Sequence, residues 1–559
     1  MVSPWTNRTT CCSSTPKFRM LRSSFIKAHK TVLATAERTF VRSYASSTPA
    51  TGNTPAKPST RAKLMRYAGA ATAGTVAYMG YHVYNAVALP GQKQADPSKP
   101  HLVIVGSGWG SVATLKTLDF SKYNVTVISS RNYFLFTPLL PSTATGLIEQ
   151  RSIMEPTRAI LRKKTHSSTF VEGEVIDVDP FKKTVTVSTK ANSYKELGVG
   201  LPAVTQEIPY DKLIMGVGST TNTFGIKGVS DYALFMKEVE DSIAVRKRIM
   251  DCMEAASTPG LDPETRRRLM HTVIVGAGPT GVECAGEIHD FVQKDMAKFN
   301  PEVVKDFKVS LLEVQPNILA AGFNQTLVDY ATETLKRESV DIMTKTMVTG
   351  ADAEKVYATR TLADGTKENV EFPYGLFIWA GGIGLRPVVK NLFAKIPEQN
   401  ESRRGLRVDE HLRVIGADDF WALGDCADAK LAPTAQVASQ EGAYLGKLLG
   451  EVAKLDDLKL ERSKETDAGK IAKLDSQIHR AEILPKFEYA HQGSLAYIGD
   501  DRAVADITWF GKQYSSSGFL TYIFWRSAYL SMVFSFRNKF LVAMDWTKAI
   551  VFGRDLSRE

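Results

Sequence analysis

Cysteine is scarce in this chain of 559 residues, which contains five cysteines and no CxxC pair or other metal-ligand spacing. The five are Cys11, Cys12, Cys252, Cys284 and Cys426. This pattern indicates neither a disulfide framework nor a zinc ribbon, and it disfavours a disulfide reductase. We therefore expect no metal site and a body of the protein with reduced thiols.

Acidic residues are nearly absent from the first 63 residues, which hold eleven Lys and Arg against one Glu. The whole chain has a net charge of +10, so this arm accounts for the excess and the remainder is balanced. A balanced body gives no support for a nucleic-acid surface. A basic, Ser- and Thr-rich arm is typical of a mitochondrial transit peptide, which we predict for residues 1–60; a disordered basic tail is the alternative.

Long hydrophobic runs are also rare, and mean hydropathy is -0.15, so at most one or two membrane segments fit. One stretch from Tyr67 to Gln92 carries no formal charge and exceeds the ~20 helical residues that cross a bilayer. It is rich in Ala, Gly and Thr, so an Ala-rich helix against the body of the protein is the alternative. We predict a transmembrane segment at 61–92 and a Pro-rich linker at 93–100.

A strand, glycine turn and helix pattern occurs twice. HLVIVGSGWGS begins at His101, and HTVIVGAGPTG begins at His271. In such units the first glycine makes the turn, the second admits a pyrophosphate, and the helix N-terminus supplies N–H donors. The predicted contacts are Gly106, Gly108, Trp109 and Gly110 in the first unit, and Gly276, Gly278, Pro279, Thr280 and Gly281 in the second. Ser111 replaces the usual third Gly or Ala and should crowd the first unit slightly.

The strand that follows each turn predicts the nucleotide's ribose ligand. KVSLLEV ends in Glu313, and a carboxylate there binds ribose hydroxyls and repels a 2′-phosphate, which favours NADH over NADPH. A surface glutamate at a strand end is the alternative. In the first unit VTVISS ends in Ser129 and Ser130, followed by Arg131, so the first ribose has no predicted acid.

Two dinucleotide units without a CxxC pair indicate a flavoprotein in which NAD(P)H reduces FAD. The segment VIGADDFWALGDCAD supports this interpretation because its Gly-Asp pair places Asp425 at the FAD ribityl and phosphate region. Alternating strands and helices predict an α/β fold with two Rossmann-like domains, the second inserted into the first. We predict that the FAD-binding domain comprises residues 101–240 and 386–510, and that the NADH-binding domain comprises residues 241–385 between them. The second part of the FAD-binding domain contains a charged helical insertion from Glu451 to Lys486. Residues 511–559 form a predicted C-terminal domain.

These strings, together with RNYFLFTPLLP, NTFGIKGV, PTAQVASQE and GSLAYIG, resemble the type II NADH:quinone oxidoreductases, especially the mitochondrial alternative NADH dehydrogenases. The resemblance implies Thr137 and Pro138 along the flavin ring, Glu283 near the nicotinamide, and Gln436 and Gln440 at a quinone site. Glutamines at i and i+4 share a helix face; without the family match they would be read as polar positions on a solvated helix. The further implied contacts are Ser129, Arg131, Gly218, Ala435 and Gln436 for FAD, Gly381 for NADH, where the family has Thr, and Tyr529 for quinone.

The resemblance also implies the activity: NADH reduces FAD, and FAD then reduces membrane ubiquinone without proton pumping. A tethered NADH-binding flavoprotein with a signalling or assembly role is the competing hypothesis. The C-terminal segment resembles a membrane-anchoring and dimerising domain, with interfacial rings expected at Trp525, Tyr529, Phe534, Phe536 and Trp546 and cations at Arg526, Arg537 and Lys539. A helix hidden in a dimer interface is the alternative.

The order of the N-terminal segments predicts the side of the membrane. If the transit arm enters the matrix and the run from Tyr67 stops transfer, everything after Pro90 faces the intermembrane space. The chain would then oxidise cytosolic NADH at the outer face of the inner membrane. Cleavage after the run, or its burial in the protein, would instead give a matrix enzyme.

Overall fold

The computed structural model describes residues 89–189, 204–320, 322–509 and 512–558, with eight isolated positions between 69 and 84. The elements below all belong to the unit Met79–Glu559. Among the described residues, no helix is both long enough and apolar enough to cross a membrane. The predicted transit arm, and most of the predicted transmembrane segment, lie outside the described residues.

The first glycine turn belongs to a five-stranded parallel sheet with the order β21-β9-β1-β2-β5. Its strands are β1 (His101–Val105), β2 (Asn124–Ser129), β5 (Ser168–Glu172), β9 (Lys212–Met215) and β21 (Phe420–Ala422). Val103 and Ile104 in β1 are both fully buried although they point to opposite faces. A parallel sheet that is covered on both faces requires this uninterrupted apolar run.

The second glycine turn belongs to a second parallel sheet with the order β11-β18-β12-β13-β14. Its strands are β11 (Leu234–Phe235), β12 (His271–Val275), β13 (Lys308–Leu312), β14 (Val340–Met343) and β18 (Leu376–Trp379). Strand β21 lies beyond this whole unit in the sequence, yet it pairs with β9 in the first sheet. The predicted α/β class is therefore confirmed, and in the chain the strands of the second sheet fall between strands of the first.

The chain passes between the two sheets at one antiparallel pair, β10 (Ser219–Thr221) with β19 (Ile383–Leu385). The chain returns toward the first sheet at β19, which ends at Leu385, where the inserted unit was expected to end. The outward crossing comes earlier than the predicted boundary at 241, because β11 already pairs with β18 of the second sheet. A two-residue edge strand has too little periodicity to be recognised from sequence.

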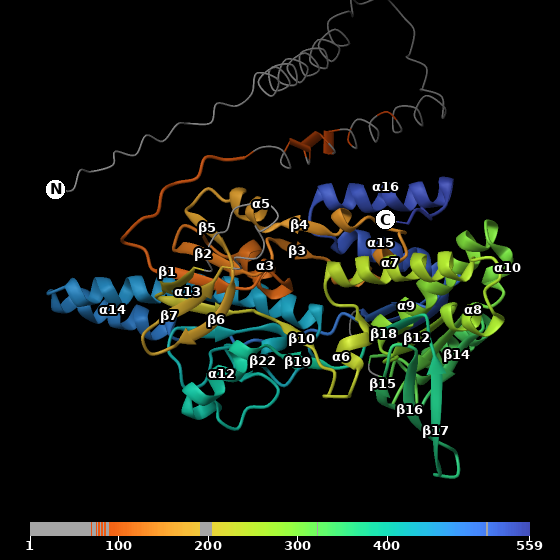
Figure 1. Ribbon diagram of the computed structural model, residues 1–559. Helices are drawn as coiled ribbons and strands as arrows, with labels where there is room; N and C mark the ends of the chain where they lie inside the picture. The colour runs from red at the N-terminus through yellow and green to blue at the C-terminus, as the bar shows by residue number, and fades with distance from the viewer. Residues whose placement is uncertain are drawn as a thin grey trace, which may run out of the picture. The chain divides into compact units, whose positions relative to one another are not determined.

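A long helical hairpin follows the first sheet, as the charged stretch predicted. Helices α13 (Ala435–Lys464) and α14 (Ala468–Ala481) lie side by side (Figure 1). The start of α13 packs against α3 (Trp109–Thr117), the helix of the first glycine turn. A Cβ on Gly442 of α13 would lie 2.0 Å from the carbonyl oxygen of Gly110. Glycine at 442 therefore permits the close helix approach that fixes α13 beside the first dinucleotide turn.

The remaining elements support these two sheets. The antiparallel sheets are β6 (Glu174–Asp179), β7 (Thr184–Ser188) and β8 (Thr205–Pro209); β15 (Thr346–Ala351), β16 (Lys355–Thr361) and β17 (Lys367–Pro373); and β23 (Ser494–Tyr497), β24 (Ala503–Trp509) and β25 (Lys512–Gly518). The main further helices are α4 (Leu140–Ala144), α5 (Thr157–Arg162), α7 (Val239–Ala256), α8 (Pro263–Leu269), α9 (Pro279–Asp290), α11 (Gln325–Arg337) and α12 (Pro387–Lys395). The predicted start of the C-terminal domain at 511 falls between the paired strands β24 and β25.

The chain ends in two helices, α15 (Phe519–Met532) and α16 (Phe536–Phe552), which contact each other. Three rings expected at lipid headgroup depth are instead buried in the protein: Trp525 is 2%, Tyr529 8% and Trp546 6% exposed. That part of the expectation was wrong. The rings pack against one another and against the rest of the chain, with Trp525 and Tyr529 centroids 4.6 Å apart. Aromatic clusters of this kind stabilise a core as readily as an interface.

Aliphatic and phenylalanine side chains, not the predicted rings, form the exposed apolar surface of these helices. Its members are Phe519, Leu520, Ile523, Phe524 and Met532 around α15 and Phe540, Met544, Ile550, Val551 and Phe552 on α16, each at least 46% exposed. We call this set the C-terminal apolar surface. A surface with so many large exposed apolar side chains marks an interaction site.

Candidate active site

A cavity of about 1000 Å³ joins the two dinucleotide units. It is at the upper end of the ~300–1,000 Å³ range of ligand pockets. All twelve residues predicted to contact FAD line it: Gly106, Gly108, Trp109, Gly110, Ser129, Arg131, Thr137, Pro138, Gly218, Asp425, Ala435 and Gln436. From the second unit, Gly278, Pro279, Thr280 and Glu283 line the same cavity, whereas Gly276, Gly281, Glu313 and Gly381 do not.

The glycines of both turns fit the binding of a dinucleotide. A Cβ on Gly108 or on Gly278 would meet no heavy atom within 4 Å, so the backbone of each turn is open toward the cavity. Gly106 has φ +105°, and a Cβ there would lie 2.1 Å from the oxygen of Gly216. Open backbone at a helix N-terminus is what a pyrophosphate requires, and this chain provides it twice in one cavity.

Ser111 does not obstruct the first unit. Its side chain is fully buried and it is absent from the cavity lining. It faces Gly216, where a Cβ would lie 2.6 Å from the Ser111 oxygen. The expected crowding is relieved because Gly216, which directly follows β9, has no side chain and leaves the space that Ser111 needs.

Glu313 follows β13 directly and turns back onto the second glycine turn. Its Oε2 accepts the N–H of Ala277 at 2.6 Å, and its Oε1 accepts the N–H of Gln315 at 2.8 Å. The carboxylate therefore sits beside the turn that faces the dinucleotide, although it does not line the cavity itself. This is the location expected of an acid that binds ribose hydroxyls.

Glu283 lies on α9, where it lines the cavity and is only 6% exposed. Its Oε1 accepts the backbone N–H of Tyr497 at 3.2 Å. Burial raises the pKa of Glu283 to about 8, and the nearby Glu287 carboxylate raises it further while the Tyr497 N–H opposes the shift. This shift favours the protonated form of the Glu283 carboxyl near neutral pH. Tyr529 from α15 lines the same cavity, and burial raises the pKa of its hydroxyl well above its usual value.

The two glutamines of α13 are placed differently. Gln436 lines the cavity; its Oε1 accepts from the Tyr489 hydroxyl and from the N–H of Gln492, and its Nε2 donates to the Gly493 oxygen at 3.3 Å. Gln440 is absent from the lining. Its amide pairs with the backbone of Ala490, donating at 2.8 Å and accepting at 3.0 Å. Gln440 thus holds the segment that orients Gln436.

Asp425 lies on the segment after β21 and lines the cavity. Asp425 Oδ2 accepts a hydrogen bond from the Ser219 hydroxyl. Lys237 Nζ lies 3.8 Å from the same Oδ2 and donates to Ser219 Oγ at 2.7 Å. Burial lowers the pKa of Lys237, while Asp425 opposes this change. Near Asp425, the Glu441 carboxylate accepts a hydrogen bond from the N–H of Gly424 at 2.6 Å. Burial raises the pKa of Glu441 to about 7.

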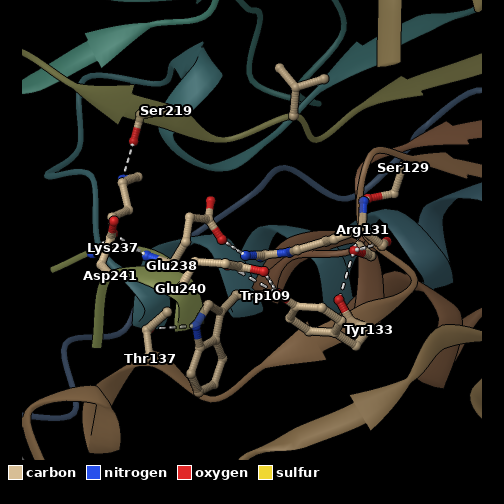
Figure 2. Close-up of polar contacts among 12 residues, drawn as sticks. Trp109, Ser129, Arg131, Tyr133, Thr137, Ser219, Lys237, Glu238, Glu240 and Asp241 are labelled. Atoms are coloured by element: carbon tan, nitrogen blue, oxygen red, sulfur yellow. Dashed lines mark hydrogen bonds and ion pairs between the residues drawn. The ribbon is translucent and has the colours of Figure 1, made fainter. Parts of the chain in front are cut away.

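Lys237 and Glu238 were not predicted from sequence, yet both line the cavity. They precede α7, and Glu238 caps that helix in a reciprocal pair with Asp241. Glu238 forms an ion pair with Arg131, and Figure 2 shows these two side chains meeting beside Trp109 and Tyr133. The sequence signals a helix start at this point at most; nothing in it indicates a contact with the end of β2.

Comparison with known proteins gave consistent matches. The family model described as pyridine nucleotide-disulphide oxidoreductase matches residues 100–442, and the model described as NDH2 C-terminal domain matches residues 491–555. The chain is 50% identical to the external alternative NADH-ubiquinone oxidoreductase, mitochondrial, of Yarrowia lipolytica, over 87% of this chain and 85% of the relative. It is 41% identical to the external NADH-ubiquinone oxidoreductase 2, mitochondrial, of Saccharomyces cerevisiae, over 87% and 88%.

Among solved structures, the chain is similar to NDH2 from Plasmodium falciparum in complex with NADH. The TM-score is 0.71 and the sequences are 27% identical, with 82% of this chain and 100% of that chain covered. The two family models together match residues from the first dinucleotide unit and from the C-terminal helices.

Proposed function

Because this chain belongs to the family of type II NADH:ubiquinone oxidoreductases, we propose that it transfers two electrons from NADH through FAD to ubiquinone without pumping protons. The observation that carries the proposal is the single cavity onto which both glycine turns open. Bound FAD supplies the chemistry that accepts a hydride and passes electrons to a quinone. The protein supplies binding, orientation and a dry environment.

The described residues have distinct tasks in this proposal. The turn at Gly106 to Gly110 holds the FAD pyrophosphate, and the turn at Gly276 to Gly281 holds that of NADH. Glu283, whose raised pKa favours its protonated form, donates a hydrogen bond into the region between the two units. Gln436 uses one hydrogen of its amide on Gly493, so its second hydrogen is free to bind a quinone carbonyl next to Tyr529.

Turnover with a soluble short-chain quinone tests this function. Purified protein should oxidise NADH at a rate that depends on added quinone, and should use NADPH poorly. Flavin that is reduced by NADH and then stays reduced in the presence of quinone would contradict the proposal. That outcome would favour a tethered flavoprotein with a signalling or assembly role.

Nucleotide preference depends on Glu313 in this proposal. Replacing Glu313 by Gln should raise the kcat/KM ratio of NADPH to NADH about tenfold, because the carboxylate that repels a 2′-phosphate is removed. Gln keeps a hydrogen-bond acceptor for the N–H of Ala277, so the fold of the turn should persist. An unchanged ratio would show that Glu313 is not the ribose ligand.

Gln436 and Gln440 should separate in stopped-flow experiments. Gln436→Leu should slow reoxidation of the reduced flavin by quinone at least tenfold, because the quinone-facing donor is lost. It also removes the contacts of Gln436 with Tyr489, Gln492 and Gly493, but these residues lie outside the inserted NADH unit, so flavin reduction by NADH should stay nearly unchanged. Gln440→Leu, one turn along the same helix, is the matched variant. It removes two backbone contacts of Ala490 and should have a smaller effect on reoxidation. Equal damage to both half-reactions by Gln436→Leu would instead indicate a role in flavin binding or folding.

We assign the C-terminal apolar surface to contact with the inner mitochondrial membrane, with a second copy of the chain as a further partner in a homodimer. Large exposed side chains such as Leu520, 80% exposed, and Phe552, 82% exposed, support this assignment. Amphipathic helices bind an interface in proportion to the apolar area that they bury. Part of this surface belongs to α15, the helix that also delivers Tyr529 to the cavity, so a membrane quinone would reach the site from this side.

The chain should act at the outer face of the inner membrane. The transit arm directs the N-terminus to the matrix, the uncharged run from Tyr67 stops transfer, and Arg61, Lys63 and Arg66 remain on the matrix side. Mitochondria stripped of the outer membrane should therefore oxidise added NADH, and added protease should remove this activity. If protease leaves the catalytic domain intact and added NADH is not oxidised, the protein faces the matrix.

A further inference from the structure

The two dinucleotide units differ at the position that normally binds ribose. Val105 pairs with Ile128 in the first sheet, and Val275 pairs with Leu312 in the second. The next residue is therefore Ser129 in the first unit and Glu313 in the second. The Ser129 hydroxyl lies 2.9 Å from Ser107 Oγ. The first unit thus has no carboxylate at the strand end where one usually receives the ribose hydroxyls.

Glu238 brings a carboxylate to this same end of β2. It lies at the N-terminus of α7, far from β2 in the sequence, and forms an ion pair with Arg131, two residues after Ser129. Its second oxygen lies 3.7 Å from Arg386 Nη2. The side chains of Arg131 and Glu238, which meet in Figure 2, are 24% and 33% exposed. The pair is therefore partly shielded, and both residues line the cavity.

The other carboxylates that line the cavity fit this position less well. Asp425 is engaged by Ser219 and Lys237, and Glu283 lies on α9 of the second unit. Glu174 is close to β2, because the N–H of Gly173 donates to the Ser129 oxygen at 2.9 Å, but its side chain is exposed. Glu238 is instead held by two arginines and by its helix cap. A carboxylate that is already ordered loses less conformational entropy on binding a ligand.

We propose that Glu238, oriented by Arg131, accepts a hydrogen bond from the adenosine ribose of FAD in place of the missing strand-end acid. A charged acceptor strengthens the bond to a hydroxyl. The two flanking arginines balance the charge of this carboxylate when a ligand covers it. The inference rests on the proposed function only in taking FAD as the dinucleotide of the first unit.

The test measures FAD binding without NADH or quinone. Full-length protein is stripped of FAD, and the dissociation constants of FAD and of its 2′-deoxy- and 3′-deoxyadenosine analogues are measured by flavin fluorescence. The unmodified protein should lose at least about tenfold in affinity for one analogue, as expected for a hydrogen bond to a charged group. Glu238→Gln should bind FAD about tenfold more weakly and should no longer distinguish that analogue from FAD.

Two matched variants make the result specific. Glu240→Gln changes the neighbouring acid, which accepts from the Tyr133 hydroxyl at 3.2 Å and does not line the cavity; it should keep both the affinity and the discrimination. If Glu238→Gln weakens FAD and both analogues equally, Glu238 acts only on the helix cap and the proposal is wrong. It is also wrong if Glu174→Gln, and not Glu238→Gln, removes the discrimination. Loss of quinone turnover with these binding results intact would overturn the proposed function alone.

Discussion

Replacing Gly281 by Ala should slow the reduction of bound flavin by NADH at least about a hundredfold, while the protein retains its FAD. A Cβ at position 281 would lie 1.9 Å from the backbone oxygen of Gly276. Neither atom belongs to a flexible side chain, so the N-terminus of α9 must move away from the glycine turn. A displacement of about 1 Å at a reacting pair is enough to cost two orders of magnitude in rate. The FAD-binding sheet does not contain this turn, so flavin content should stay near that of the unmodified protein.

Stopped-flow reduction by NADH, with flavin content measured from absorbance, checks this prediction. Gly350→Ala is the control in the same inserted unit, because a Cβ there would meet its nearest neighbours at 3.7 and 4.0 Å, which is ordinary contact. Chemically reduced Gly281→Ala should still be reoxidised by quinone at the normal rate. Normal reduction by NADH in this variant would show that the α9 turn does not position the nucleotide.

Replacing Arg554 by Met should lower the free energy of unfolding by about 3–5 kcal/mol, because it leaves two buried carboxylates without their cation. Arg554 Nη2 lies 3.2 Å from Glu287 Oε2, and its Nε lies 3.4 Å from Asp295 Oδ2. The three side chains are at most 11% exposed. Glu287 also accepts the hydroxyls of Ser142 at 2.7 Å and Thr145 at 3.3 Å. Arg554 therefore joins the residues after α16 to Glu287 on α9 and to Asp295, and Glu287 in turn joins α9 to the segment around α4.

Thermal unfolding in detergent, with FAD present, checks this expectation. Arg558→Met is the matched control: its Nε lies only 2.7 Å from Asp251 Oδ1, but the two side chains are 58% and 31% exposed, so its loss should cost no more than about 1 kcal/mol. Burial, rather than the distance between charges, separates the two variants. The double variant Arg554→Met with Glu287→Gln should recover part of the lost stability. Equal melting temperatures for the two single variants would contradict this account of Arg554.

The local sequence was sufficient to predict the dinucleotide units. An apolar strand followed by Gly106 and Gly108, or by Gly276 and Gly278, has few alternative structures, because each glycine is required by a turn or an open backbone. Glu313 could be assigned in advance for the same reason, since the position follows directly from the strand that carries it. Charge density likewise predicted a solvated helical segment from Glu451 to Lys486, because so many charged side chains cannot be buried; that this segment belongs to a hairpin of α13 and α14 came from the structure.

The exposure of the C-terminal rings could not be predicted in this way. Trp525 and Trp546 belong to helices whose sequences carry large apolar side chains on several sides, so periodicity did not show which face meets the protein. The structure buries these two rings and exposes residues such as Leu520 and Phe552. Neighbouring elements decide the outcome: α15 packs on β24 and on α16.

By itself the sequence determined the two dinucleotide turns, the insertion of one unit into the other, the acid beside the second turn and the basic arm at the N-terminus. These features depend on residues that are near one another in the chain. Only the tertiary structure decided that Gln436 reaches the cavity while Gln440 binds Ala490, that Gly216 makes room for Ser111, and that Glu238 meets Arg131. Each of these contacts joins segments that are distant in the chain, and their approach is set by the packing of helices and sheets, which local sequence patterns do not specify.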